Sequence, residues 1–156
     1  MAEHARQTLE SRGVDVAWLD LKELEMPLCD GGAAYAHPNA ATAKGLVEAA
    51  DAVLLATPVY NFDANAAAKN LIELTGRAWT GKVVGFLCAA GGQASYMSIM
   101  SLANSLMLDF RCFIVPRFVY ALGDAFEGGD DIAEEIAARI DELAAETVRV
   151  AGALAT

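Results

Sequence analysis

Two short runs of uninterrupted apolar residues, 52–57 and 83–89, constrain the fold of this chain more than any other feature. Their lack of alternation is typical of parallel strands that are covered by helices on both faces. Residues Val14 to Leu19 alternate and residues 111–115 form a shorter apolar run, so both are predicted as further strands. Strict alternation of these strands with helical patterns predicts an α/β fold with a doubly wound, three-layer parallel sheet. The predicted helices span residues 2–12, 39–50, 64–75, 94–108 and 131–154.

No linker or internal repeat divides the chain, so we predict a single domain over residues 1–156. The net charge is −10, from 21 acidic and 11 basic residues, and a surface of this kind repels nucleic acid and anionic membranes. The uncharged stretch 83–108 is interrupted by Gly91 and Gly92, which makes a membrane-spanning helix unfavourable. We therefore expect neither a nucleic-acid partner nor a membrane partner.

The three cysteines, Cys29, Cys88 and Cys112, have no spacing that is typical of a metal site. Cys88 and Cys112 lie in apolar runs, where buried structural thiols are expected. The first residues, Met1 to Arg6, contain no apolar segment of the kind found in secretory signals. These features indicate a protein of the reduced cytoplasm, and no metal ligand is assigned.

The first candidate loop follows the 52–57 run and reads Pro58-Val59-Tyr60-Asn61. In open α/β sheets, ligands bind at the carboxyl ends of the strands. Pro58 is expected to end the strand because it lacks an N–H group. Tyr60 offers a flat face and Asn61 offers both a donor and an acceptor, which suits a planar heteroaromatic ligand. A plain turn is the alternative interpretation, since proline and asparagine are common in turns.

The second candidate loop, Ala90-Gly91-Gly92-Gln93, follows the 83–89 run and precedes a predicted helix. Adjacent glycines allow close approach of a ligand to the backbone, and free amides at a helix start favour anions or carbonyl oxygens. A single Gly-Gly pair is also compatible with an ordinary loop. Two such loops on neighbouring strand ends favour a binding site at that edge of the sheet.

Residues 57–61 read Thr-Pro-Val-Tyr-Asn, and Lys69-Asn70 follow on the next helix. A strand that ends in Thr-Pro-x-Tyr-Asn, followed by a helix with Leu-Lys-Asn, is the hallmark of the NADPH-dependent FMN reductase family. This chain resembles that family over essentially its whole length, with Ala68 in place of the leucine. The resemblance implies a flavodoxin-like fold and a flavin site on the two loops.

Carried over to this sequence, the resemblance implies that the first loop lies along the isoalloxazine ring and ribityl chain, and that the second faces the pyrimidine edge of the ring. Lys69 and Asn70 would hold the helix and the loop together, and no side chain is assigned a catalytic role. The implied cofactor-binding residues are Pro58, Val59, Tyr60, Asn61, Ala90, Gly91, Gly92 and Gln93.

The activity that the resemblance implies is hydride transfer from NADPH or NADH to N5 of FMN, with a small flavin or another electron acceptor as partner. An FMN-containing quinone, azo-dye or metal-oxyanion reductase is an alternative that uses the same ring loops. A non-enzymatic flavodoxin-like electron carrier is a second alternative, although the Tyr-Asn and Lys-Asn pattern speaks against it. A response-regulator receiver would need an aspartate where the chain has Thr57-Pro58.

Two features depart from the family. The Gly-Ser-x-Arg-x-x-Ser loop that cradles the FMN phosphate has no counterpart here, and the chain opens with a helix where the fold opens with a strand. In the strand order 2-1-3-4-5 that missing first strand is the central one. We therefore expect roughly 25 to 30 residues before Met1 in the natural protein, about a strand and a loop. We also expect weak FMN binding, or none, by residues 1–156.

The predicted helix 94–108 carries no charge, although a surface helix normally carries charge opposite its core face. Its apolar residues are either buried within one chain or form a subunit interface. The family resemblance favours a homodimer or homotetramer, so we expect the interface. The apolar residues concerned are Tyr96, Met97, Ile99, Met100, Leu102, Leu106 and Met107.

Overall fold

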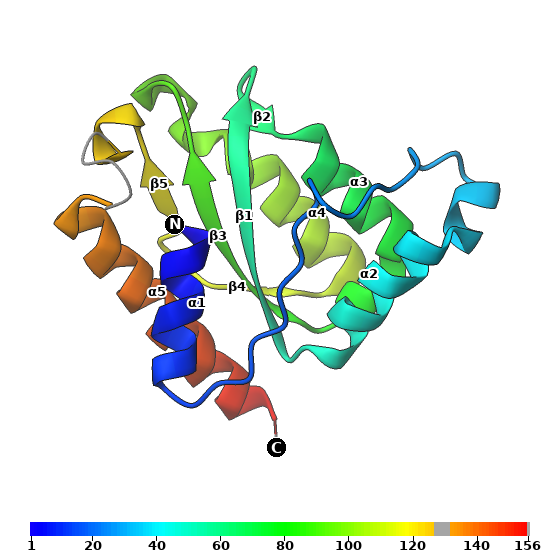
Figure 1. The fold of residues 1–156 in the computed structure, drawn as a ribbon, viewed down its shortest axis with the longest axis horizontal. Coiled ribbons are helices and arrows are strands. Elements are labelled where there is room, and N and C mark those ends of the chain that lie inside the picture. The colour runs from blue at the N-terminus through cyan, green and yellow to red at the C-terminus, as the bar shows by residue number, and fades with distance from the viewer. Residues whose placement is uncertain (127–131, 156) are drawn as a thin grey trace.

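The computed structural model describes residues 1–126 and 132–155, and its sheet is built on two long parallel strands (Figure 1). β1 (Ala52–Tyr60) pairs with β3 (Val83–Ala89) along the whole length of β3. β4 (Phe113–Ile114) and β5 (Val119–Ala121) run parallel to β3 on its other side, and β2 (Asp63–Ala64) returns antiparallel to the end of β1. The expected α/β fold with a mostly parallel sheet is confirmed.

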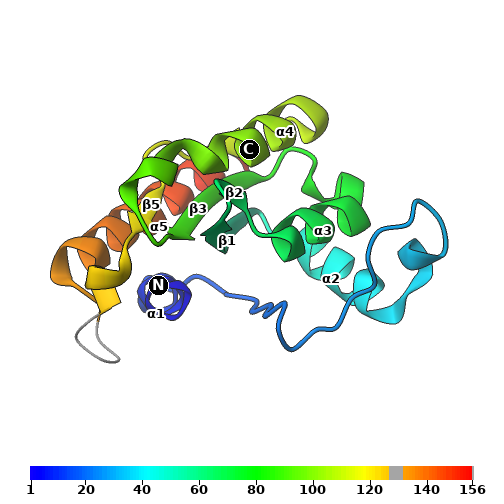
Figure 2. The same cartoon turned by 90° about the horizontal axis from the view of Figure 1, so that it is seen from above.

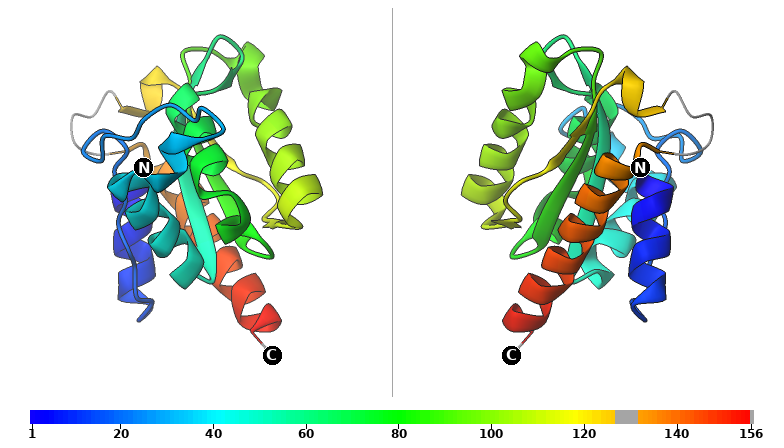
Figure 3. Two further views of the ribbon diagram at one scale, coloured as in Figure 1. Left: turned by 90° about the vertical axis from the view of Figure 1, so that its right-hand side faces the viewer. Right: turned by 90° about the vertical axis from the view of Figure 1, so that its left-hand side faces the viewer.

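The helices lie on both faces of this sheet (Figures 2 and 3). The α-helices are α1 (Ala2–Ser11), α2 (Pro38–Ala49), α3 (Ala66–Thr75), α4 (Met100–Phe110) and α5 (Glu134–Leu154). Helices α1 and α5 pack against each other and cover one face, whereas α3 and α4 cover the other. Short 3₁₀ helices connect the elements: η1 (Ala33–Ala36), η2 (Gly76–Trp79), η3 (Gln93–Ile99) and η4 (Gly123–Phe126).

Strand β3 shows why its sequence is apolar without interruption. Every residue from Val83 to Cys88 is buried. Val83 and Leu87 belong to the core under α1 and α5, whereas Phe86 and Cys88 belong to the core under α3 and α4. Successive side chains of a strand point to opposite faces, so a strand covered by helices on both faces needs an apolar residue at every position.

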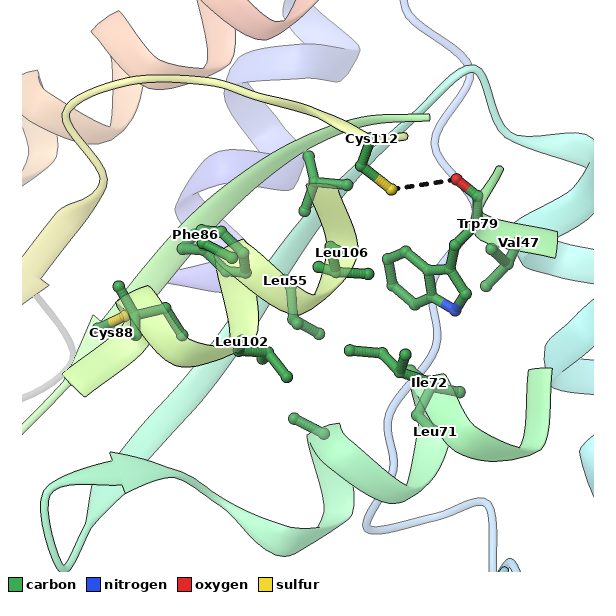
Figure 4. Close-up of a cluster of buried hydrophobic side chains, with 14 of the residues drawn as sticks. Val47, Leu55, Leu71, Ile72, Trp79, Phe86, Cys88, Leu102, Leu106 and Cys112 are labelled. Atoms are coloured by element: carbon green, nitrogen blue, oxygen red, sulfur yellow. Dashed lines mark hydrogen bonds between the residues drawn. The ribbon is translucent and has the colours of Figure 1, made fainter. Parts of the chain in front are cut away.

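The larger core centres on Trp79, which is fully buried between α3, α4 and the sheet (Figure 4). Its indole Nε1–H donates to Thr75 Oγ1 at 2.7 Å, and its carbonyl oxygen accepts the thiol of Cys112 at 3.1 Å. Pairing these buried polar atoms avoids the free-energy cost of leaving them without a partner. This core fixes the position of α3 and α4 relative to the carboxyl ends of β1 and β3.

Residues Val14 to Leu19 do not form the predicted strand. They have no strand pairing in the described residues, and Trp18 is 47% exposed with the Arg6 guanidinium 5.5 Å from its ring centre. A strand is defined by hydrogen bonds to a neighbour. Over residues 52–58, β1 has a strand partner only on the β3 side within the described part of the chain, so this segment finds none there.

Three further predictions differ in their boundaries. The strand predicted at 111–115 is shorter, and pairing with β3 resumes at β5 after an interruption at Pro116 and at Arg117, which has a φ of +60°. The helix predicted at 94–108 begins as the 3₁₀ helix η3 and becomes α-helical only at Met100. The last helix begins at Glu134, and residue 131 lies outside the described residues.

The uncharged stretch 83–108 folds as a buried strand, a loop and parts of two helices. Among the described residues, no helix has both the length and the apolar character that crossing a membrane would require.

Candidate functional site

The two loops singled out in the sequence lie side by side at one edge of the sheet. Pro58 is paired with Ala89 at the carboxyl ends of β1 and β3, so the residues that follow each of them emerge next to each other. We call the surface formed by residues 58–63 and 90–96 the rim. Ligands of open α/β sheets bind at such strand ends.

The first loop is a tight β-hairpin, which the sequence did not predict. Strand β1 continues through Pro58 to Tyr60, so Pro58 does not end it. Proline is tolerated there because β1 has no partner on the side away from β3 over residues 52–58 in the described part of the chain. Asn61 and Phe62 then form a two-residue turn with φ values of +50° and +67°. Positive φ at both central positions is the signature of a type I′ turn, which matches the twist of the flanking strands.

The hairpin presents aromatic surface at the rim and is attached to the neighbouring helix. Tyr60 is 62% exposed and Phe62 is 58% exposed, whereas Val59 between them and the sheet is buried. Ser101 of α4 donates to the carboxylate of Asp63 at 3.0 Å. This contact ties the hairpin to α4.

The buried Thr57 and the half-buried Asn65 support the hairpin and were not identified as functional from the sequence. The Thr57 hydroxyl donates to Asn65 Oδ1 at 3.2 Å and lies 3.3 Å from the Asn65 N–H, which donates to it. The same Asn65 Oδ1 accepts the Ala68 N–H at 3.0 Å and thereby caps α3. The Thr-Pro of the strand end and the cap of the next helix are therefore one hydrogen-bonded unit, and only the cap was readable from sequence.

The second loop has free space above its backbone. A Cβ atom added to Gly91 or Gly92 would meet nothing within 4 Å, and neither glycine has a positive φ. Neither the packing of the chain nor its backbone conformation requires glycine at these two positions. The two glycines therefore leave room for close approach by another molecule. A flat ring resting against this backbone fits the observation, so the residues present suit the ring of a flavin.

The side chains of Lys69 and Asn70 make different contacts. The Asn70 side chain accepts the Cys29 N–H at 2.8 Å and donates to the Pro27 carbonyl at 2.9 Å, which ties α3 to the loop before α2. Lys69 pairs with Glu73 on the surface of α3 at 2.8 Å. Neither side chain belongs to the rim. The expectation that both hold α3 to the first loop is not met, since Asn70 ties α3 to residues 27–29 instead and Lys69 contacts Glu73 of its own helix.

The thiol nearest the rim is unreactive. Cys88 lies on β3 one residue before Ala89, and burial raises its pKa to about 12. Its sulfur therefore stays protonated at neutral pH and is not a nucleophile. Since no charged side chain except Asp63 lies within the rim, the polar groups that it offers to a ligand are mainly backbone amides and carbonyls.

Two hollows lie away from the rim. One, of about 410 Å³, lies along α5 between Arg139 and Arg149 and reaches Pro116 and Arg117. The other, of about 400 Å³, lies beside residues 25–27 and 37–39. None of the residues implied in flavin binding lines either hollow, so neither belongs to the site described above.

An open, mostly parallel sheet with helices on both faces, and with two loops that emerge from adjacent strand ends, is typical of the flavodoxin-like class of α/β proteins. The NADPH-dependent FMN reductase family matches residues 1–127 of this chain, and the chain belongs to that family. The family resemblance noted in the sequence is thereby confirmed. The chain is an oxidoreductase whose cofactors are FMN and NAD(P)H.

Relatives of known identity are consistent with this assignment. An NAD(P)H-dependent FAD/FMN reductase of Geobacillus thermodenitrificans is 33% identical over 141 residues, which is 88% of this chain and 76% of the relative. An oxidoreductase structure from Corynebacterium diphtheriae superimposes with a TM-score of 0.73 at 20% identity, over 97% of this chain and 85% of the other. The NAD(P)H:acceptor flavoenzyme FerB of Paracoccus denitrificans gives 0.72 at 20% identity, over 95% and 87%. At these identities the two structures establish the fold alone.

Proposed function

We propose that the chain, as a single domain, transfers a hydride from NADPH or NADH to N5 of FMN bound at the rim. The observation that carries this proposal is the open space above Gly91 and Gly92, on the loop after β3, which pairs with β1 up to Pro58, two residues before the exposed Tyr60. A planar ligand placed there would contact backbone on one side and an aromatic side chain on the other. The Geobacillus relative is described as a reductase of FAD and FMN, which is the same chemistry.

In this proposal the protein positions the reactants and supplies no acid or base. FMN, when bound, supplies the hydride-accepting ring atom. The chain contributes a shelf made of Pro58, Val59, Tyr60 and Asn61 and a second shelf made of Ala90, Gly91, Gly92 and Gln93. Backbone N–H groups of the second shelf can donate to carbonyl oxygens of the ring edge, which stabilises negative charge there at little reorganisation cost. Thr57 and Asn65 hold the first shelf to α3.

Affinity for FMN is proposed to be weak in this chain. The sequence contains no counterpart of the family's phosphate-binding loop, and phosphate contacts usually supply much of the binding energy. We expect lumiflavin, which has the ring without the phosphate, to bind about as well as FMN. Titration followed by NMR measures both dissociation constants, and tight stoichiometric binding of FMN would overturn the expectation.

The decisive experiment compares two glycine substitutions that are equally tolerated by the fold. Gly92→Val places a branched side chain in the free space at the rim, and Gly45→Val places the same side chain on the exposed surface of α2, also with nothing within 4 Å. Both variants should fold. Gly92→Val should lower ring affinity and NADPH oxidation with excess FMN by at least about tenfold, and Gly45→Val should change neither. Equal effects of the two substitutions would argue against a flavin at the rim.

The physiological electron acceptor is a separate matter. We propose FMN itself as the acceptor, with a quinone, azo-dye or metal-oxyanion reductase that retains FMN as the alternative. NADPH oxidation is measured first with FMN alone and then with catalytic FMN plus a quinone. Turnover that saturates with FMN and gains nothing from the quinone supports the flavin reductase.

We also propose a homodimer or homotetramer formed through α4, in the cytoplasm. The support is exposed apolar surface on this helix, since Met100 is 41% exposed, Met107 39% and Leu108 76%. The residues that pack inward are Ile99, Leu102 and Leu106. The outer face of α4 therefore carries exposed apolar side chains together with the exposed Ser101, Asn104 and Asp109, and the apolar side chains favour an interface over burial within one subunit.

A further inference from the structure

A single hydrogen bond from β5 fixes the orientation of one peptide group on the rim. The Tyr120 hydroxyl donates to the Gly92 carbonyl oxygen at 2.5 Å. Two residues earlier, the Ala90 N–H donates to the Ala121 carbonyl at 2.9 Å. The loop after β3 is thus attached to β5 at both of these points, and the Ala90 side chain also packs against the larger core.

The direction of the Gly92 carbonyl determines the direction of the next amide. A trans peptide group is planar, with its C=O and its N–H pointing in opposite directions, and the described residues contain no cis peptide bond. Because the Gly92 carbonyl points to Tyr120, the N–H of Gln93 points away from β5. Gln93 is the first residue of η3, and its N–H forms no hydrogen bond within the described residues. It is a free donor at the rim.

Tyr120 is well placed to hold this orientation because its ring cannot move freely. The residue is 8% exposed. The ring of Tyr96 meets it edge to face, with 5.3 Å between centroids, and also stacks on Phe118 at 4.9 Å. Aromatic contacts of this kind restrict the ring, so the hydroxyl has a fixed position under the loop. Its only hydrogen-bond partner in the described part of the chain is Gly92.

We propose that Tyr120 is a positioning residue of the flavin site, whose hydroxyl aims the Gln93 N–H at a carbonyl oxygen of the bound ring. This inference rests on the proposed function. A donor that is oriented before the ligand arrives binds more strongly than one that must be ordered on binding. Tyr120 itself does not contact the ligand, and it acts through the backbone of the second loop.

The test is Tyr120→Phe, which removes the hydroxyl and keeps the ring. The matched control is Tyr35→Phe, which removes a tyrosine hydroxyl on η1, away from the rim. In the flavin-free chain, NMR order parameters of Gly92 and Gln93 should fall from about 0.85 to below about 0.6 in Tyr120→Phe and stay unchanged in the control. The order parameter of Cys88 on β3 should stay unchanged in both variants, which shows that the fold is intact.

The second measurement is affinity for the ring. Dissociation constants for lumiflavin and for FMN should rise by the same factor, about three- to tenfold, in Tyr120→Phe, because the loss of one oriented hydrogen bond affects the ring and not the phosphate. An ordered Gly92 in Tyr120→Phe, or a loosened loop with unchanged lumiflavin affinity, would overturn the proposal. Absence of lumiflavin binding by the wild-type chain would instead contradict the proposed function, while the order parameters still decide whether Tyr120 restrains the loop.

Discussion

At the scale of single residues, the site depends on polar contacts beneath the rim more than on the side chains that face outward. Thr57 is 3% exposed and its hydroxyl both donates to and accepts from Asn65, which in turn caps α3. Two rigid elements, β1 and α3, are therefore linked through one side-chain oxygen. The loop between them can be exposed and still keep a single conformation.

Replacing Asn65 by alanine should lower the free energy of unfolding by about 1 to 2 kcal/mol, because it removes the helix cap and leaves the buried Thr57 hydroxyl with fewer partners. Thr57→Val should cost a similar amount. The double variant should cost clearly less than the sum, since both changes remove the same unit. Urea unfolding of the wild type, the two single variants and the double variant measures the coupling energy between Asn65 and Thr57. Strictly additive losses of unfolding free energy would contradict a shared hydrogen-bond network.

The three thiols should differ sharply in reactivity. Burial raises the pKa of Cys88 to about 12 and that of Cys112 to about 11, so neither forms the reactive thiolate near neutral pH. Cys29 is partly exposed and has no such protection. A colorimetric thiol reagent at pH 8 should modify one cysteine per folded chain quickly and all three after unfolding. Cys29→Ser should abolish the fast phase; a fast phase that persists would show that the core opens.

At the scale of secondary-structure elements, close approach between helix and sheet decides which residues are allowed. A Cβ at Gly85 of β3 would lie 2.7 Å from Leu54 Cδ2 on β1 and 3.2 Å from Leu143 Cδ1 on α5. In contrast to Gly91 and Gly92, this glycine is required by packing. Packing therefore favours glycine at position 85 of β3, but it does not favour glycine at positions 91 and 92 of the loop that follows.

Gly85→Ala should therefore destabilise the fold, by about 1 kcal/mol, because Leu54 must move and is only partly buried. Leu54→Ala should remove most of this penalty in the double variant, since it frees the space that the new methyl group needs. Thermal unfolding of the single and double variants checks both expectations. A Gly85→Ala chain as stable as the parent would show that the α5 contact is looser than described.

The hairpin between β1 and β2 contains a residue that is costly for stability. Phe62 has a φ of +67°, a conformation that bulky side chains avoid and glycine adopts freely. Phe62→Gly should raise the free energy of unfolding by up to about 1 kcal/mol or leave it unchanged. If the exposed Phe62 ring contacts a ligand or a second subunit, the same variant should bind the flavin ring more weakly or self-associate more weakly. Loss of stability in Phe62→Gly would mean that the ring packs more than its 58% exposure indicates.

At the scale of the whole molecule, association is expected through the outer face of α4. Met107→Lys places a charge among exposed apolar residues and should weaken self-association by at least about tenfold, because the ammonium would be buried without a partner. Ala41→Lys, on the exposed face of α2, is the control and should leave the assembly unchanged. Sedimentation velocity across a dilution series separates the two cases. Ser101 is unsuitable for a carboxylate in this test because it contacts Asp63 within the chain.

The sequence by itself determined the class of fold, the order of its elements and the family. Uninterrupted apolar runs at 52–57 and 83–89 are typical of parallel strands covered on both faces. β3 is such a strand, whereas β1 is parallel but only partly covered, since Ala56 is exposed and Ala52, Val53 and Leu54 are half-buried. The residues after each strand had to emerge at one edge, so the adjacency of Pro58–Asn61 and Ala90–Gln93 was also predictable. Local sequence patterns were sufficient because these features depend on the periodicity of apolar residues and on the direction in which the strands run.

Only the tertiary structure decided what depends on neighbours distant in sequence. Residues Val14 to Leu19 have a strand pattern and yet form no strand, since pairing needs a partner that pattern alone cannot provide. The hydrogen bond from Tyr120 to Gly92 joins residues 28 positions apart, and the bond from Ser101 to Asp63 joins residues 38 apart. The periodicity of the sequence does not reveal such contacts, because each forms only when the fold brings two elements together. They are the contacts that hold the rim in shape.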